Sequence, residues 1–133
     1  MRFTVSGDVF EKYPETRIGV VIAANVRNTG SGEEITKLLE NIQTLTKERF
    51  EINTLAENPS IAVWRNVYNS FGSKPRDYRS SIEALIRSVL NGRGIRHINK
   101  LVDIYNYISL KYSISSAIRP ADFVLHTPFQ CFH

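Results

Sequence analysis

The stretch that decides the fold is Gly94-Ile95-Arg96-His97-Ile98-Asn99-Lys100-Leu101-Val102-Asp103-Ile104-Tyr105-Asn106-Tyr107-Ile108. It predicts a helix that begins near Ile98 or Asn99 and ends at about Tyr112. Apolar side chains recur there at the spacing of one helical face, namely Ile98, Leu101, Val102, Tyr105 and Ile108. Asp103, Asn106 and Ser109 lie three residues apart and therefore also share one face.

Three more helices are expected upstream, each with a start signal. Ser31 and Glu34 form a capping box before the apolar repeat of residues 35–45. Asn58-Pro59 is a cap followed by a proline in the first turn, and Gly72 ends the apolar stripe that follows it. Ser80 and Glu83 are a second capping box, and that helix closes at Asn91-Gly92.

The strand signals are fewer. Phe3–Val5 is a short candidate strand, and residues 17–26 (RIGVVIAANV) have the continuous β-branched composition of a central strand covered on both faces. The predicted fold class is therefore α/β, or α+β, with a small sheet packed against about four helices. Two strands do not make a stable sheet alone. Either the tail adds strands or the sheet lacks partners, and an unpaired sheet edge would favour self-association.

The overall composition is that of one globular domain. The chain has 133 residues, of which 42% are hydrophobic, enough to cover one core. No apolar run approaches the ~20 residues that a membrane span needs. Met1-Arg2-Phe3-Thr4-Val5 leads directly into a polar turn at Ser6-Gly7-Asp8, so we expect no signal peptide and no membrane association. With Cys131 as the only cysteine, a cytoplasmic location is predicted.

The positive charge is concentrated in one segment. Residues 74–100 hold seven Lys/Arg against two Asp/Glu, whereas the whole chain has a net charge of +4. Such a cluster attracts a polyanion, because phosphate contacts release counterions; the alternative is an ordinary solvated helix face. The candidate RNA-binding residues are Lys74, Arg76, Arg79, Arg87, Arg93, Arg96 and Lys100. Tyr78, His97 and Tyr107 could add stacking surfaces.

The quoted stretch resembles a signature of bacterial phenylalanyl-tRNA synthetase beta subunits, which carry Gly-Ile-Arg, Ile-Asn, Val-Val-Asp and Thr-Asn-Tyr at the same spacing. Free-standing proteins made of that subunit's tRNA-binding and editing domain, the B-three/B-four domain, are more similar still. Their motifs correspond here to Pro75-Arg76, Ser81-Ile82-Glu83-Ala84-Leu85, Val102-Asp103-Ile104-Tyr105-Asn106 and Ser109-Leu110. The resemblance covers roughly residues 1–112 and implies binding to tRNA or another RNA.

The chain also departs from the family pattern. The family histidine falls on Ala117, and the threonine before the family asparagine is Tyr105. The family domain continues further, with added strands and an acidic residue of the editing pocket. We therefore expect an incomplete, truncated tRNA-binding and editing-like domain at 1–120 and an atypical tail at 121–133.

These departures decide the order of the candidate functions. RNA binding, to tRNA above all, is predicted first. Hydrolysis of mischarged aminoacyl-tRNA is second, with no catalytic residue assigned, and an interaction module or inactive remnant is third. Asp103, Asn106 and Ser109 either line an aminoacyl pocket or satisfy loop backbone groups. His126, Cys131 and His133 lack the spacing of a zinc site, so we predict neither a metal nor a cofactor.

Overall fold

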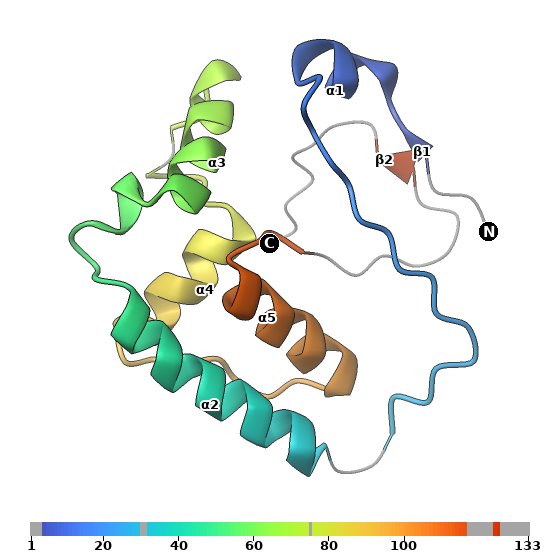
Figure 1. Ribbon diagram of the computed structural model, residues 1–133, viewed down its shortest axis with the longest axis vertical. Coiled ribbons are helices and arrows are strands. Elements are labelled where there is room, and N and C mark those ends of the chain that lie inside the picture. Colours follow the sequence, from blue (N-terminus) through green and yellow to red (C-terminus); the bar gives the residue numbers. More distant parts are fainter. Residues whose placement is uncertain (1–3, 30–31, 75, 117–123, 126–133) are drawn as a thin grey trace. The chain divides into compact units, whose positions relative to one another are not determined.

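The structure of the chain is a computed structural model that describes residues 4–29, 32–74, 76–116 and 124–125. It divides into two compact units, of which the first comprises residues 1–27 and 118–133. The second comprises residues 28–117 and contains the helices α2 to α5 (Figure 1).

The first unit contains a very short sheet. Strand β1 (Thr4–Val5) pairs in parallel with β2 (Val124–Leu125), so that Thr4 lies opposite Val124. Helix α1 (Gly7–Lys12) follows β1 directly and buries Val9. The two ends of the sequence thus meet in one backbone ladder that is two residues long.

The expected fold class is wrong. The described part of the chain is mainly helical, and its sheet is limited to the two-residue pair β1–β2. Residues 17–26 form no strand, and Val21 and Ile22 are 93% and 66% exposed. The physical reason is that β propensity mostly measures how well a side chain packs on a sheet surface. Where no neighbouring strand offers backbone partners, a β-branched composition does not make a ladder.

The second unit begins with α2 (Glu33–Arg49), which is followed by the short 3-10 helix η1 (Leu55–Glu57). Helices α3 (Pro59–Ser70), α4 (Ser81–Leu90) and α5 (Lys100–Tyr112) complete it. The longest of these helices has 17 residues. Within the described ranges, none has both the length and the apolar character that crossing a bilayer requires.

Three of the predicted helix starts are confirmed by side-chain caps. Asn58 accepts a hydrogen bond from the Ser60 backbone at 3.1 Å, Ser80 from Glu83 at 3.4 Å, and Asn99 from Val102 at 3.0 Å. Each cap satisfies an amide that has no partner inside its helix. The fourth signal differs: Ser31 lies outside the described residues, and Gly32 is the N-cap of α2.

Helices α2 and α5 lie side by side and run in the same direction (Figure 1). At their starts, the Lys100 side chain lies against Gly32; at their ends, Arg49 donates to the Lys111 carbonyl at 3.3 Å. Together with α4 they hold most of the buried core. Its members are Leu39, Ile42, Phe50, Leu55, Ile61, Ile82, Ile86, Val89 and Leu110.

The apolar face predicted for α5 is not the face that α5 buries. Ile98 is 64% exposed and Ile108 is also exposed. The buried residues are Asp103, Asn106, Ser109 and Leu110. The helix therefore turns a mostly polar face inward, where hydrogen bonds to the adjoining loops compensate the loss of water.

We expect Ile86→Ala to lower the free energy of unfolding by about 3 kcal/mol, because it leaves a cavity beneath α4. Ile86 is fully buried in the core. The measurement is urea unfolding followed by the fluorescence of Trp64, which packs against that core. The matched control is Val63→Ala, at a position of α3 that is 58% exposed. Equal effects of the two substitutions would contradict this description of the core.

Candidate nucleic-acid interface and the polar face of α5

Five of the seven predicted RNA-binding residues project into solvent at the two ends of α4. Lys74, Arg76 and Arg79 precede the helix, and Arg93 and Arg96 follow it. In the described part of the chain, none of the five takes part in an ion pair. The ten residues of α4 separate the two groups by about 15 Å. The surface thus has two cationic ends and not one continuous cluster.

The remaining two cations are engaged inside the second unit. Arg87 donates through Nε to the Glu83 carboxylate at 2.9 Å, and Arg65 donates to the same oxygen at 2.8 Å. Lys100 donates through Nζ to the Thr29 carbonyl. These contacts make Arg87 a structural residue and leave Lys100 as a link between α5 and the segment before α2.

Glu83 is a buried carboxylate at the start of α4. It is fully buried, and among the described residues its Oε2 has no hydrogen-bond partner. The predicted capping box is therefore confirmed only in part: Ser80 caps the Glu83 amide, while the Glu83 side chain binds two arginines. The four-residue spacing to Arg87 was a visible signal in the sequence. The contact with Arg65, from α3, was not.

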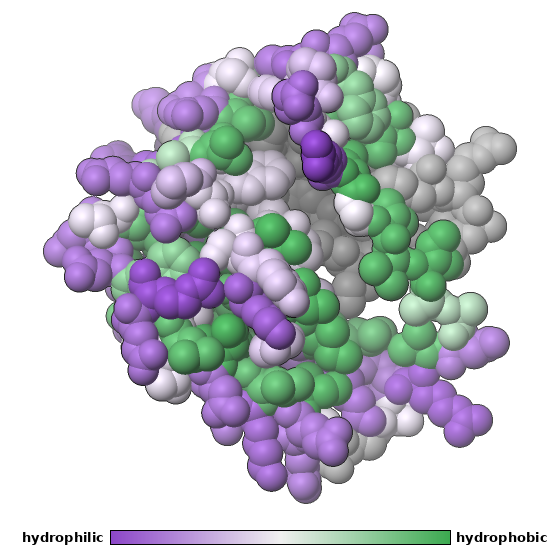
Figure 2. All heavy atoms as spheres, viewed as in Figure 1, coloured by the Kyte–Doolittle hydropathy of each residue, from purple (hydrophilic) through white to green (hydrophobic). Residues whose placement is uncertain are grey.

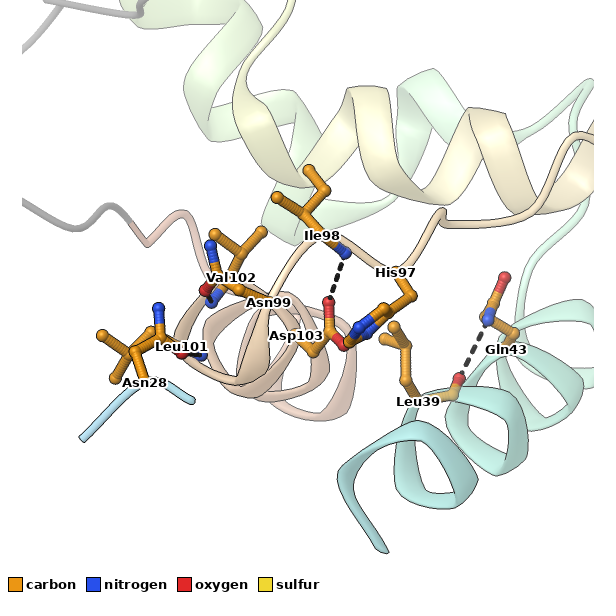
Figure 3. A network of polar contacts seen from close by, with 9 residues as sticks. All are labelled: Asn28, Leu39, Gln43, His97, Ile98, Asn99, Leu101, Val102 and Asp103. Carbon is orange, nitrogen blue, oxygen red and sulfur yellow. Dashed lines mark hydrogen bonds and ion pairs between the residues drawn. The ribbon is translucent and has the colours of Figure 1, made fainter. Parts of the chain in front are cut away.

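A second buried carboxylate, Asp103, ties the loop before α5 to that helix (Figure 3). Its Oδ1 accepts a hydrogen bond from the Ile98 amide at 3.2 Å. Its Oδ2 pairs with Nδ1 of His97, whose side chain is about half exposed. The sequence suggested His97 only as a stacking surface and gave no signal for this pair, because the loop that brings the two residues together has no periodic pattern.

The other two candidate pocket residues lie on the same inward face. Ser109 Oγ contacts Ser116 Oγ, and Ser116 donates to the Tyr105 carbonyl at 3.2 Å. Asn106 is 6% exposed. Asp103, Asn106 and Ser109 therefore share one face, as their spacing predicted, but they are not among the residues that line the groove between α2 and α5 or the hollow beside Gly32 and Lys100. Their assignment to an aminoacyl pocket stays a prediction.

Several residues that the sequence offered as motif or candidate site residues lie outside the described part of the chain. They are Pro75, Ala117, His126, Cys131 and His133. Within the described ranges, no group of three or more His, Cys, Asp or Glu side chains comes close enough to hold a metal ion. The predicted boundary between a domain and a tail at residue 120 stays a prediction.

Residues 63–124 match the family model of the B3/4 domain. The match confirms the resemblance to the B3/B4 domain of the phenylalanyl-tRNA synthetase beta subunit. It includes most of α3, all of α4 and α5, and both cationic ends of α4. No curated protein and no solved structure matches the chain. The polar face of α5 thus lies within the residues that match the B3/4 domain.

We expect Asp103→Ala to lower the free energy of unfolding by about 2 kcal/mol. The reason is that the Ile98 amide loses an acceptor and a buried polar site is left open. His97→Ala should cost less, since that side chain is about half exposed. Urea unfolding measures both. Asp77→Ala, at an exposed turn position, is the matched control, and an Asp103 variant as stable as this control would contradict the anchoring role.

Proposed function

We propose that this protein binds tRNA through the two cationic ends of α4. The observation that carries the proposal is that Lys74, Arg76, Arg79, Arg93 and Arg96 are all exposed and outside the ion pairs of the described chain. Uncompensated arginine and lysine side chains are the groups that bind nucleic-acid backbones.

The loop that presents Arg93 and Arg96 is held in shape by its neighbours. Gly92 and Gly94 have φ values of +77° and +68°, which side chains other than glycine rarely adopt. Ser88 Oγ donates to the Gly94 carbonyl at 2.7 Å, and the Ile95 amide donates to Gln43 Oε1 at 2.7 Å. A loop ordered before binding loses less entropy on binding, which favours its two arginines as phosphate contacts.

Two backbone hydrogen bonds lie at the other end of α4. The amides of Asp77 and Tyr78 both donate to the Lys74 carbonyl, at 2.9 and 3.0 Å. Arg79 directly precedes the capping residue Ser80. Tyr78 is 54% exposed, so its ring is accessible for stacking on an unpaired base. This end therefore offers both charge and an aromatic surface.

The choice of tRNA as the RNA rests on the family match. The B3/4 domain is linked to the phenylalanyl-tRNA synthetase beta subunit, and the matched residues include both cationic ends of α4. Charge alone would favour any RNA equally, because backbone contacts carry no sequence information.

We expect Arg93→Ala with Arg96→Ala to weaken tRNA binding about tenfold at low salt. Each lost phosphate contact should also make the slope of log K against log salt concentration about one unit less steep. Filter binding of labelled tRNA at several NaCl concentrations measures both quantities. The matched control is Arg17→Ala with Arg27→Ala, which removes two exposed arginines elsewhere in the chain.

The proposal fails if the wild-type protein retains no tRNA at low salt. It also fails if the two double variants lose affinity equally, because binding would then follow net charge and not the ends of α4.

A further inference from the structure

A groove runs between the parallel helices α2 and α5, on the described surface of the second unit. It has a volume of about 360 Å³ and carries no acidic side chain. Apolar side chains gather over this region in the space-filling view (Figure 2). The groove is lined by Leu38, Asn41, Ile42, Leu45, Arg49, Tyr107 and Lys111.

The apolar wall of the groove comes from α2. Leu38 and Leu45 belong to the apolar repeat predicted at residues 35–45, but they are 44% and 48% exposed. The residues of α2 that belong to the buried core are Leu39 and Ile42. Leu38 and Leu45 lie seven residues, or two turns, apart on one side of the helix, which is the spacing of contacts with another helix.

The C-terminal end of the groove is positively charged. Arg49 stands at the end of α2, and Lys111 near the end of α5 lies 5.4 Å from the ring centroids of both Tyr107 and Tyr112. Tyr107 in particular raises the pKa of Lys111 above its ordinary value. The ammonium group is charged at neutral pH, as lysine side chains ordinarily are. Within the described chain, neither cation is paired with a carboxylate.

We propose that this groove binds an amphipathic helix of a partner protein, with acidic residues in the first turn of that helix. Its apolar face would pack on Leu38 and Leu45, and its acidic turn would lie against Arg49 and Lys111. The partner helix then runs antiparallel to α2 and α5. That direction places its positive N-terminal dipole near the negative C-terminal ends of both helices, and acidic residues favour the first turn of a helix.

The length of the groove sets the length of the ligand. From Leu38 to Arg49, α2 advances by about 16 Å, which corresponds to about eleven helical residues of the partner. The chain's own exposed apolar stretch, residues 17–26, contains Arg17 and no acidic residue, so it does not complement the charged end. RNA is disfavoured because the α2 wall, with Leu38 and Leu45, is aliphatic, and Tyr107 is the single aromatic residue among those that line the groove.

The test uses a fluorescent synthetic peptide of about 14 residues, with leucines at helical spacing and glutamates in its first turn. Fluorescence anisotropy with the full chain should give saturable binding. Leu45→Glu and Lys111→Glu should each weaken it at least about fivefold, because one removes an apolar contact and the other an attractive charge. Val63→Glu adds the same charge at an exposed apolar site of α3 and should leave binding unchanged.

A second peptide carries lysines in place of the glutamates. It should bind poorly to the wild-type protein and better to Lys111→Glu, and this exchange distinguishes a charge contact from misfolding of the variant. Absence of binding by the first peptide, or equal binding of both peptides, would overturn the proposal. Loss of tRNA binding in Leu45→Glu would reassign the groove to RNA. Dimerisation of the wild-type chain that Leu45→Glu abolishes would reassign it to a second copy.

Discussion

The carboxylate of Asp103 is the constraint on which much of the second unit depends. It is fully buried, and it accepts from the Ile98 amide while pairing with His97. These two contacts hold the loop between α4 and α5 against the first turn of α5. Because α5 packs along α2 and against α4, the same carboxylate helps to position Arg96 in that loop and the groove beside α2. A buried carboxylate without such donors would be strongly destabilising.

Glu83 plays the corresponding part at the start of α4. Its Oε1 accepts hydrogen bonds from both Arg65 and Arg87, so a shared carboxylate joins α3 and α4. This contact also divides the cations of residues 74–100 by role. Arg87 belongs to the framework, Lys100 links α5 to Thr29, and the five exposed residues remain for a polyanion. The charge surplus seen in the sequence is therefore not equivalent to a binding surface.

The positions of the main helices were predicted correctly, whereas the faces that α2 and α5 bury were not. Caps at Asn58, Ser80 and Asn99 depend on contacts within a few residues, so local sequence was sufficient to locate α3, α4 and α5. The inward faces of α2 and α5 depend on which helices lie beside them. Leu38, Leu45 and Ile98 belong to the predicted apolar repeats but are exposed, while Asp103 and Ser109 are buried. A helical period identifies neighbours on a face, but it does not say which face meets the core.

By itself, the sequence determined the four main helices, most of their caps, the B3/4 resemblance, and the concentration of positive charge around α4. All of these are set by residues close together along the chain. Tertiary structure alone decided the absence of a strand at 17–26 in the described chain, the pairing of His97 with Asp103, and the joining of Arg65 to Glu83. It also decided which cations stay exposed. Each of these depends on partners brought together from separate elements, and a strand without a neighbouring backbone has no ladder to join.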